Sequence, residues 1–194
     1  IEGETLKARL ARGPLTLEET LRVMEAMGAG LNYAHQQGIL HRDIKPSNVM
    51  MARDGGIYIA DFGLARIALA GESTLSTDAM LGTPHYMSPE QASGERELDA
   101  RTDIYAVGCI LDEMIAGEPP FTGPNPQAII IRSMTDAPRP LPASRAGIPA
   151  QLNALVARSL AKSPADRFPN AKAMADALRL ALGGSPSGAM DAVG

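Results

Sequence analysis

The sequence contains little cysteine, histidine or lysine, and it has no long hydrophobic segment. Its single cysteine, Cys109, excludes an internal disulfide framework and a cysteine-rich zinc site, and it suits a reducing compartment. With only three histidines, the sequence has few ligands for a histidine-based metal centre. No apolar run approaches the roughly 18 residues of a membrane-spanning helix. The first residues also lack the basic-then-apolar layout of a signal peptide.

An excess of positive charge is missing as well. The 194 residues include 18 basic and 22 acidic side chains, which gives a net charge of −4 and an isoelectric point near 5.4. This balance argues against binding nucleic acid or an anionic membrane through bulk charge. The length suits one domain with a real core. Only four of the basic residues are lysine, namely Lys7, Lys45, Lys162 and Lys172.

Hydrophobic periodicity predicts an α+β fold that is mainly α, with one small β-hairpin. The run Thr16-Leu17-Glu18-Glu19 is a capping box, so we expect a helix to begin at Thr16 and to end before Gly38. Two β-leaning runs, 49–51 and 57–60, flank the turn residues 53–56 and predict the hairpin. Further helices are expected at 5–11, 103–116, about 127–135, about 150–161 and 170–182.

The densest group of polar residues is His41-Arg42-Asp43-Ile44-Lys45-Pro46-Ser47-Asn48, followed by Asp61-Phe62-Gly63. Because the hairpin folds back, Asn48 and Asp61 can lie close together. A carboxylate and an amide oxygen suit Mg²⁺ (or Mn²⁺) that is held partly by phosphates. Asp43 can accept a proton from a hydroxyl, and Lys45 offers a positive charge to a phosphoryl group. Together these residues favour phosphoryl transfer.

These motifs resemble the C-terminal lobe of eukaryotic-like serine/threonine protein kinases, close to the bacterial Hanks-type enzymes. Further matches follow in the family's order: the run Gly82–Glu90 is similar to the substrate-docking loop, Asp103 heads a later motif, and Arg167 lies within another. The resemblance covers roughly residues 1–182. Antibiotic phosphotransferases share the Asp…Asn…Asp logic, but they are not expected to show Lys45 or the loop at 82–90.

The resemblance implies a kinase that uses ATP, Mg²⁺ and protein substrates. Asp43 is then the catalytic base that orients the substrate hydroxyl, Lys45 steadies the γ-phosphate, and Asn48 and Asp61 hold the metal ions. Residues expected to contact ATP are Ile1, Lys45, Asn48, Met50 and Asp61.

The resemblance also implies structural roles. His41 and Phe62 are similar to the family's stacked spine residues, and Asp103 is placed like the residue that braces the catalytic-loop backbone. Arg167 is placed like the arginine that pairs with the Glu90 position. Within the docking loop, Gly82, Thr83 and Glu90 are the matched positions, and Thr83 is expected to contact Asp43 and Lys45.

Activation-loop phosphorylation is a further expectation from the resemblance. Arg42 and Arg66 resemble the family arginines that gather a loop phosphate. Donor hydroxyls lie between them and the docking loop, and we favour Thr77 over Ser76 and Thr74. The alternative is that these hydroxyls belong to solvent-facing loop residues and are never phosphorylated. His35 and His85 are expected to be surface or packing residues, and Cys109 is expected to be buried and inert.

The family's N-terminal lobe supplies a glycine-rich phosphate cover, a strand lysine and a helix glutamate, and none of these is matched here. The opening run 1–6 resembles the middle of the interlobe hinge. None of the four lysines is placed for the ATP role of the strand lysine. Gly28-Ala29-Gly30 lies within a helix and follows no strand, so it indicates close helix packing. We therefore expect the C-terminal lobe without the N-terminal lobe.

Two domain-level expectations follow. Residues 1–182 form the partial catalytic domain, and residues 183–194 form a flexible Gly/Ser/Pro tail. The partners would be ATP, protein substrates and, in a longer chain, its own N-terminal lobe, with no nucleic acid. The location would be cytoplasmic, either free or as the cytoplasmic part of a membrane-anchored kinase. The alternative function is a catalytically inactive lobe that acts as an interaction module.

Overall fold

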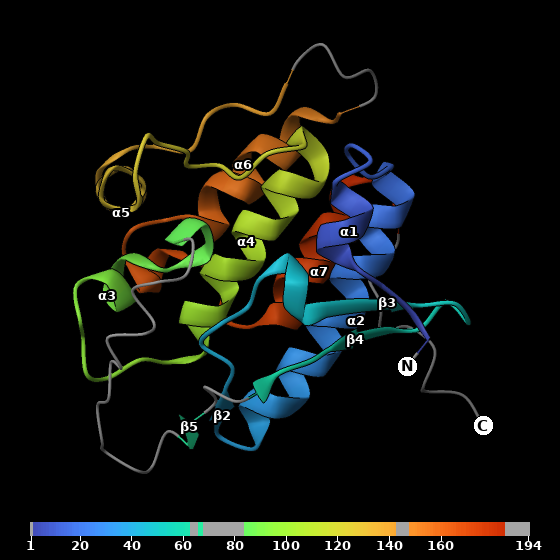
Figure 1. The fold of residues 1–194 in the computed structure, drawn as a ribbon, viewed down its shortest axis with the longest axis horizontal. Helices are drawn as coiled ribbons and strands as arrows, with labels where there is room; N and C mark the ends of the chain where they lie inside the picture. The colour runs from blue at the N-terminus through green and yellow to red at the C-terminus, as the bar shows by residue number, and fades with distance from the viewer. Residues whose placement is uncertain (1, 63–65, 68–83, 143–147, 185–194) are drawn as a thin grey trace.

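The computed structural model describes residues 2–62, 66–67, 84–142 and 148–184. Short strands and 3₁₀ turns alternate with helices in the first half, and helices dominate the second half (Figure 1). The elements are β1 (Gly3–Thr5), α1 (Leu6–Leu10), α2 (Leu17–Gln36), β2 (Ile39–Leu40), η1 (Pro46–Asn48), β3 (Val49–Ala52), β4 (Ile57–Ile59), β5 (Arg66–Ile67), η4 (Pro84–Tyr86), α3 (Pro89–Ala92), α4 (Ala100–Ala116), α5 (Pro126–Thr135), α6 (Ala150–Ser159), η5 (Pro164–Asp166) and α7 (Ala171–Ala181).

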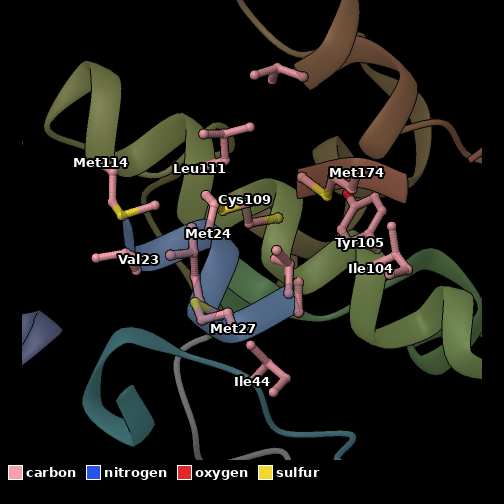
Figure 2. Packing of buried hydrophobic residues seen from close by; sticks show 14 of the residues in the cluster. Val23, Met24, Met27, Ile44, Ile104, Tyr105, Cys109, Leu111, Met114 and Met174 are labelled. Atoms are coloured by element: carbon pink, nitrogen blue, oxygen red, sulfur yellow. The ribbon is translucent and has the colours of Figure 1, made fainter. Parts of the chain in front are cut away.

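Helix α4 forms the centre of the hydrophobic core. It is apolar on almost every side, and nearly all of its residues from Thr102 to Ile115 are buried. Figure 1 shows α4 in the middle of the fold with α6 alongside it. Close up, Met24 and Met27 of α2 lie against the same core as Cys109 of α4 (Figure 2). The expectation that Cys109 is buried is confirmed, and burial raises the pKa of its thiol well above the ordinary value.

Helix α2 confirms the predicted capping box and its predicted end. The Thr16 side chain accepts from the Glu19 backbone N–H, the Glu19 side chain accepts in return, and Gly38 has a φ of 72°. Gly28 lies where α2 crosses α7. A Cβ there would lie 3.2 Å from the Ala175 Cβ, so this glycine serves close helix packing, as predicted.

The predicted hairpin is present as β3 and β4, in the register Val49–Ile59. Sequence analysis missed its third strand, since β1 pairs with β3 and completes the antiparallel order β1-β3-β4. It also missed the two-residue pair β2–β5. Such short strands leave no periodic pattern, because they are too brief to alternate. The 3₁₀ turn η1, at the end of the loop between β2 and β3, contacts both β1 and α1.

The largest difference from the expected boundaries is at the start of α4. Helix α4 begins at Ala100 instead of Asp103, because the Asp99 side chain caps it by accepting from the Arg101 N–H. The predicted tail falls largely outside the described residues. Of the helices described, none combines the length and apolarity needed to cross a membrane.

Candidate active site

The candidates Asp43, Lys45 and Asn48 lie together on the loop between β2 and β3. The Lys45 Nζ is 2.6 Å from Asp43 Oδ2. The Asn48 Nδ2 donates to the Asp43 backbone oxygen at 2.9 Å and lies 3.3 Å from its Oδ2. The side chains of Asp43 and Lys45 are 30% and 39% exposed, so a substrate in solvent can reach both. One carboxylate is thus held between an ammonium group and an amide.

Asp103, in the first turn of α4, holds this loop by accepting hydrogen bonds from its backbone. Its two carboxylate oxygens accept the backbone N–H groups of His41 at 2.9 Å and of Arg42 at 2.8 Å. Asp103 is 1% exposed, and Arg42 has a φ of 67°, in the left-handed region that non-glycine residues rarely adopt. A buried carboxylate therefore fixes a strained backbone directly before Asp43.

Replacing Asp103 with Asn is expected to lower the free energy of unfolding by about 1.5–3 kcal/mol, the range for a hydrogen bond to a charged group. An asparagine offers one oxygen where two backbone N–H groups need acceptors. Urea unfolding measures the loss, and NMR hydrogen exchange of the His41 and Arg42 amides locates it. Asp99→Asn is the matched control on the same helix, because Asn caps a helix about as well as Asp. Equal stability of the two variants would contradict the bracing role.

Asn48 and Asp61 lie at the open end of the hairpin. The Ala60 N–H donates to the Asn48 backbone oxygen at 2.8 Å, which places Asp61 one residue further on. Asn48 is buried and Asp61 is exposed, with a φ of 62°. Because the Asn48 amide nitrogen is engaged by Asp43, its amide oxygen is the atom left for a ligand. The donor set therefore fits Mg²⁺, which prefers oxygen ligands.

Among the described residues, no group of three or more His, Cys, Asp or Glu side chains could hold a metal. An Mg²⁺ ion held by Asn48 and Asp61 would share its coordination with phosphate oxygens and water, the usual arrangement for this ion at nucleotide sites.

His41 and Phe62 are in contact, as the resemblance implies for the spine positions. Their ring centroids are 4.5 Å apart at an interplanar angle of 53°. The His41 Nε2 also lies 3.0 Å from the Ala60 backbone oxygen. The two arginines of the expected phosphate pocket approach each other through the backbone: Leu40, two residues before Arg42, pairs with Arg66.

Glu90 and Arg167 form a buried bidentate ion pair. Arg167 Nη1 lies 2.6 Å from Glu90 Oε1 and Nη2 lies 2.7 Å from Oε2. Burial alone raises the pKa of the Glu90 carboxyl, but its hydrogen bonds with Arg167, its own backbone and Thr102 and the Arg167 charge outweigh this and hold the pKa below its ordinary value. The pair ties α3, where the expected docking loop ends, to the segment before α7.

Several expected site residues lie outside the described part of the chain. They are Ile1, Thr74, Ser76, Thr77, Gly82 and Thr83, together with the side chain of Arg66. Met50 is described, and it sits half-buried in β3, opposite Tyr58.

Sequence reasoning missed two residues that hold the loop between β2 and β3. The His35 side chain is 7% exposed, and its Nε2 lies 2.7 Å from Asp103 Oδ2. It is thus a packing residue, as expected, but one that touches the loop's brace. The Gln91 Nε2 donates to the Arg42 backbone oxygen at 2.8 Å. Gln91 had a signal in the sequence, since Ser88 and Gln91 form a capping box.

The chain is similar in sequence to proteins of a known family. A family model described as the protein kinase domain matches residues 1–178. The chain belongs to the protein kinase family. The serine/threonine-protein kinase PknB of Mycobacterium tuberculosis is 41% identical to this kinase domain over 189 residues, which cover 96% of the chain and 30% of PknB. PknL of the same species is 42% identical over 176 residues, which cover 90% of the chain and 43% of PknL.

A probable serine/threonine-protein kinase of Streptomyces coelicolor is 38% identical over 200 residues, covering all of the chain and 29% of that protein. The kinase domain is therefore of the bacterial Hanks type, similar to PknB. The chain spans about 30% of the length of the PknB relatives.

Proposed function

We propose that this chain supplies the catalytic C-terminal lobe of a protein kinase that transfers the γ-phosphoryl group of ATP to serine and threonine hydroxyls of proteins. Asp43 orients the hydroxyl and accepts its proton, while Lys45 offsets the charge on the transferred group. Asn48 and Asp61 hold Mg²⁺, which supplies charge neutralisation at the phosphates when it is bound. The observation that carries the proposal is the Asp43 carboxylate, held between Lys45 and Asn48 on a loop braced by Asp103.

The lysines support the assignment to the C-terminal lobe. Lys162 Nζ donates to the Ser133 backbone oxygen at 2.6 Å, and Lys172 pairs with Asp176 on α7. Lys7 is exposed on α1. This leaves Lys45 as the lysine at the site, and it is already required beside Asp43. A second cation for the nucleotide phosphates, together with the cover over the adenine, would then come from an N-terminal lobe.

The test is a chimera in which the N-terminal lobe of an active family member precedes residue 3. With radiolabelled ATP and Mg²⁺, the chimera is expected to label serine and threonine residues of itself and of a generic protein substrate. The 194-residue chain alone is expected to show no measurable labelling.

Labelling by the 194 residues alone would contradict the assignment to one lobe. A folded chimera that binds ATP but transfers no phosphate would contradict the catalytic proposal and would leave the interaction module as the better account.

A further inference from the structure

Asp112, near the C-terminal end of α4, is a buried carboxylate that the proposed catalytic site does not use. Its side chain is 0% exposed. Neither carboxylate oxygen has a hydrogen-bond partner within the described part of the chain. Its salt-bridge partner is Arg139, whose Nη2 lies 3.3 Å from Asp112 Oδ1. A buried acidic group with no donor is costly when it is ionised.

Arg139 belongs to the connector, which is defined as residues 137–142 and follows α5 in the segment between α5 and α6. Its Nη1 donates to the Pro119 backbone oxygen at 2.7 Å, and its Nη2 donates to the Glu118 backbone oxygen at 2.9 Å. Leu141 anchors the same connector through its buried side chain. The connector contains three prolines, which lack a backbone N–H and so weaken regular hydrogen bonding; they are Pro138, Pro140 and Pro142. Arg139 thus fastens the connector to the end of α4.

Several charged groups act on Asp112. Burial raises the pKa of its carboxyl to about 7. The charge of Arg139 lowers this pKa, and the charges of Glu113 and Glu118 raise it further. The Cys109 thiol lies one turn earlier on α4, and burial holds its pKa well above the ordinary value. Arg139 is 32% exposed, so it lies between Asp112 and solvent, and movement of the connector would let water reach the carboxylate.

We propose that Asp112 is a proton sensor that controls release of the connector from the end of α4. With the carboxyl protonated, the closed arrangement buries a neutral group. Loss of the proton to solvent leaves a buried charge that Arg139 only partly offsets, and opening the connector hydrates it. The inference concerns the fold of this chain and does not depend on phosphoryl transfer.

The direction in which closure changes with pH follows from the pKa of Asp112 in the closed and the open state. In the closed state the Asp112 carboxyl has a pKa of about 7, and in an open, hydrated state it would have an ordinary value of about 3.9. The closed state therefore binds the proton more tightly. Closure is strongest below the ordinary value, weakens as pH rises, and levels off above about 7. Each pH unit in this interval raises the opening constant by up to tenfold.

The Leu141 amide reports opening directly, because it donates to Asn153 Oδ1 at 2.8 Å. Its hydrogen exchange is measured by NMR in the 194-residue chain between pH 5 and 8 and corrected for the intrinsic exchange rate. Protection is expected to fall at least tenfold from pH 5 to 7.5 and then to level off. The Asp136 amide, which bonds to the Arg132 oxygen at the end of α5, is expected to change far less. Protection of Leu141 that does not vary with pH overturns the proposal.

Variants assign the effect to one carboxyl. Asp112→Asn is expected to keep Leu141 protected at every pH. Glu118→Gln removes the same charge from the neighbouring turn, where the side chain is 63% exposed, and it is expected to retain the pH dependence. The reverse pattern would place the sensor at Glu118 and reject Asp112. If Asp112→Asn does not fold, a carbon-detected titration of wild-type Asp112 decides, and a pKa below 5 overturns the proposal.

Discussion

Replacing Asp43 with Asn in the chimera is expected to slow phosphoryl transfer about 100- to 10,000-fold, the usual contribution of a general base. The asparagine keeps the size of the side chain, and its oxygen can still face Lys45, but it cannot accept the hydroxyl proton. The measurement is the initial rate of transfer at saturating ATP and Mg²⁺.

The fold should tolerate this change. The Asp43–Lys45 pair is about one-third exposed, and pairs of this kind contribute about 1 kcal/mol or less. The melting temperature should therefore shift by only a few degrees. Glu97→Gln, which removes the same charge from an exposed position, is the control and should retain the full rate. An Asp43→Asn rate within tenfold of the parent would contradict the base role.

Replacing Arg167 with Met is expected to lower the free energy of unfolding by about 3–5 kcal/mol, the cost of breaking a buried ion pair by removing one partner. The guanidinium is fully buried and also donates to the backbone oxygens of Arg101, Ala161 and Lys162. Its loss removes a donor from each of these oxygens and leaves the buried Glu90 carboxylate without its opposite charge. Denaturant unfolding followed by circular dichroism measures the change.

Arg101→Met is the matched control, because Arg101 pairs with Asp99 on the surface, where the two side chains are 36% and 53% exposed. It should cost about 1 kcal/mol or less. The double variant Glu90→Gln with Arg167→Met should recover part of the loss, since no unpaired charge remains buried. If that recovery is absent, the ion pair is not the source of the effect.

The pair also predicts a pH dependence. The pKa of Glu90 is lowered in the folded state, so its contribution to stability is present above the ordinary value and is lost as pH falls through the folded value. Below the ordinary value of 4.5, stability should therefore decline more steeply in the wild type than in Arg167→Met. Parallel curves for the two proteins would contradict this origin.

Local signals in the sequence predicted much of the fold. Thr16 and Glu19 formed their capping box, and the apolar run around Cys109 formed a buried helix. The strands β1 and β5 could not be predicted, because a strand of two or three residues exists only through the partner that pairs with it. Their partners, β3 and β2, lie far away in the sequence.

In the candidate site, too, the residues close together in the sequence could be predicted to act together, and the contacts between distant positions could not. Asp43, Lys45 and Asn48 are neighbours in the sequence, so their spacing alone predicted that they act together. The contact of His35 with Asp103 joins positions 68 residues apart, and no local pattern encodes it. The buried state of Asp112 was equally hidden, since an acidic residue near a helix end usually faces solvent.

The support of the loop between β2 and β3 by α4 has a consequence for synthesis on the ribosome. The His41 amide and Asp103 are 62 positions apart, and Glu90 and Arg167 are 77 apart. As the chain emerges, the loop that carries Asp43 lacks its brace until α4 has left the exit tunnel, and Glu90 lacks its ion-pair partner until Arg167 has followed. Because domains fold as units during translation, the nascent protein should remain open to chaperones and proteases until its C-terminal helices arrive.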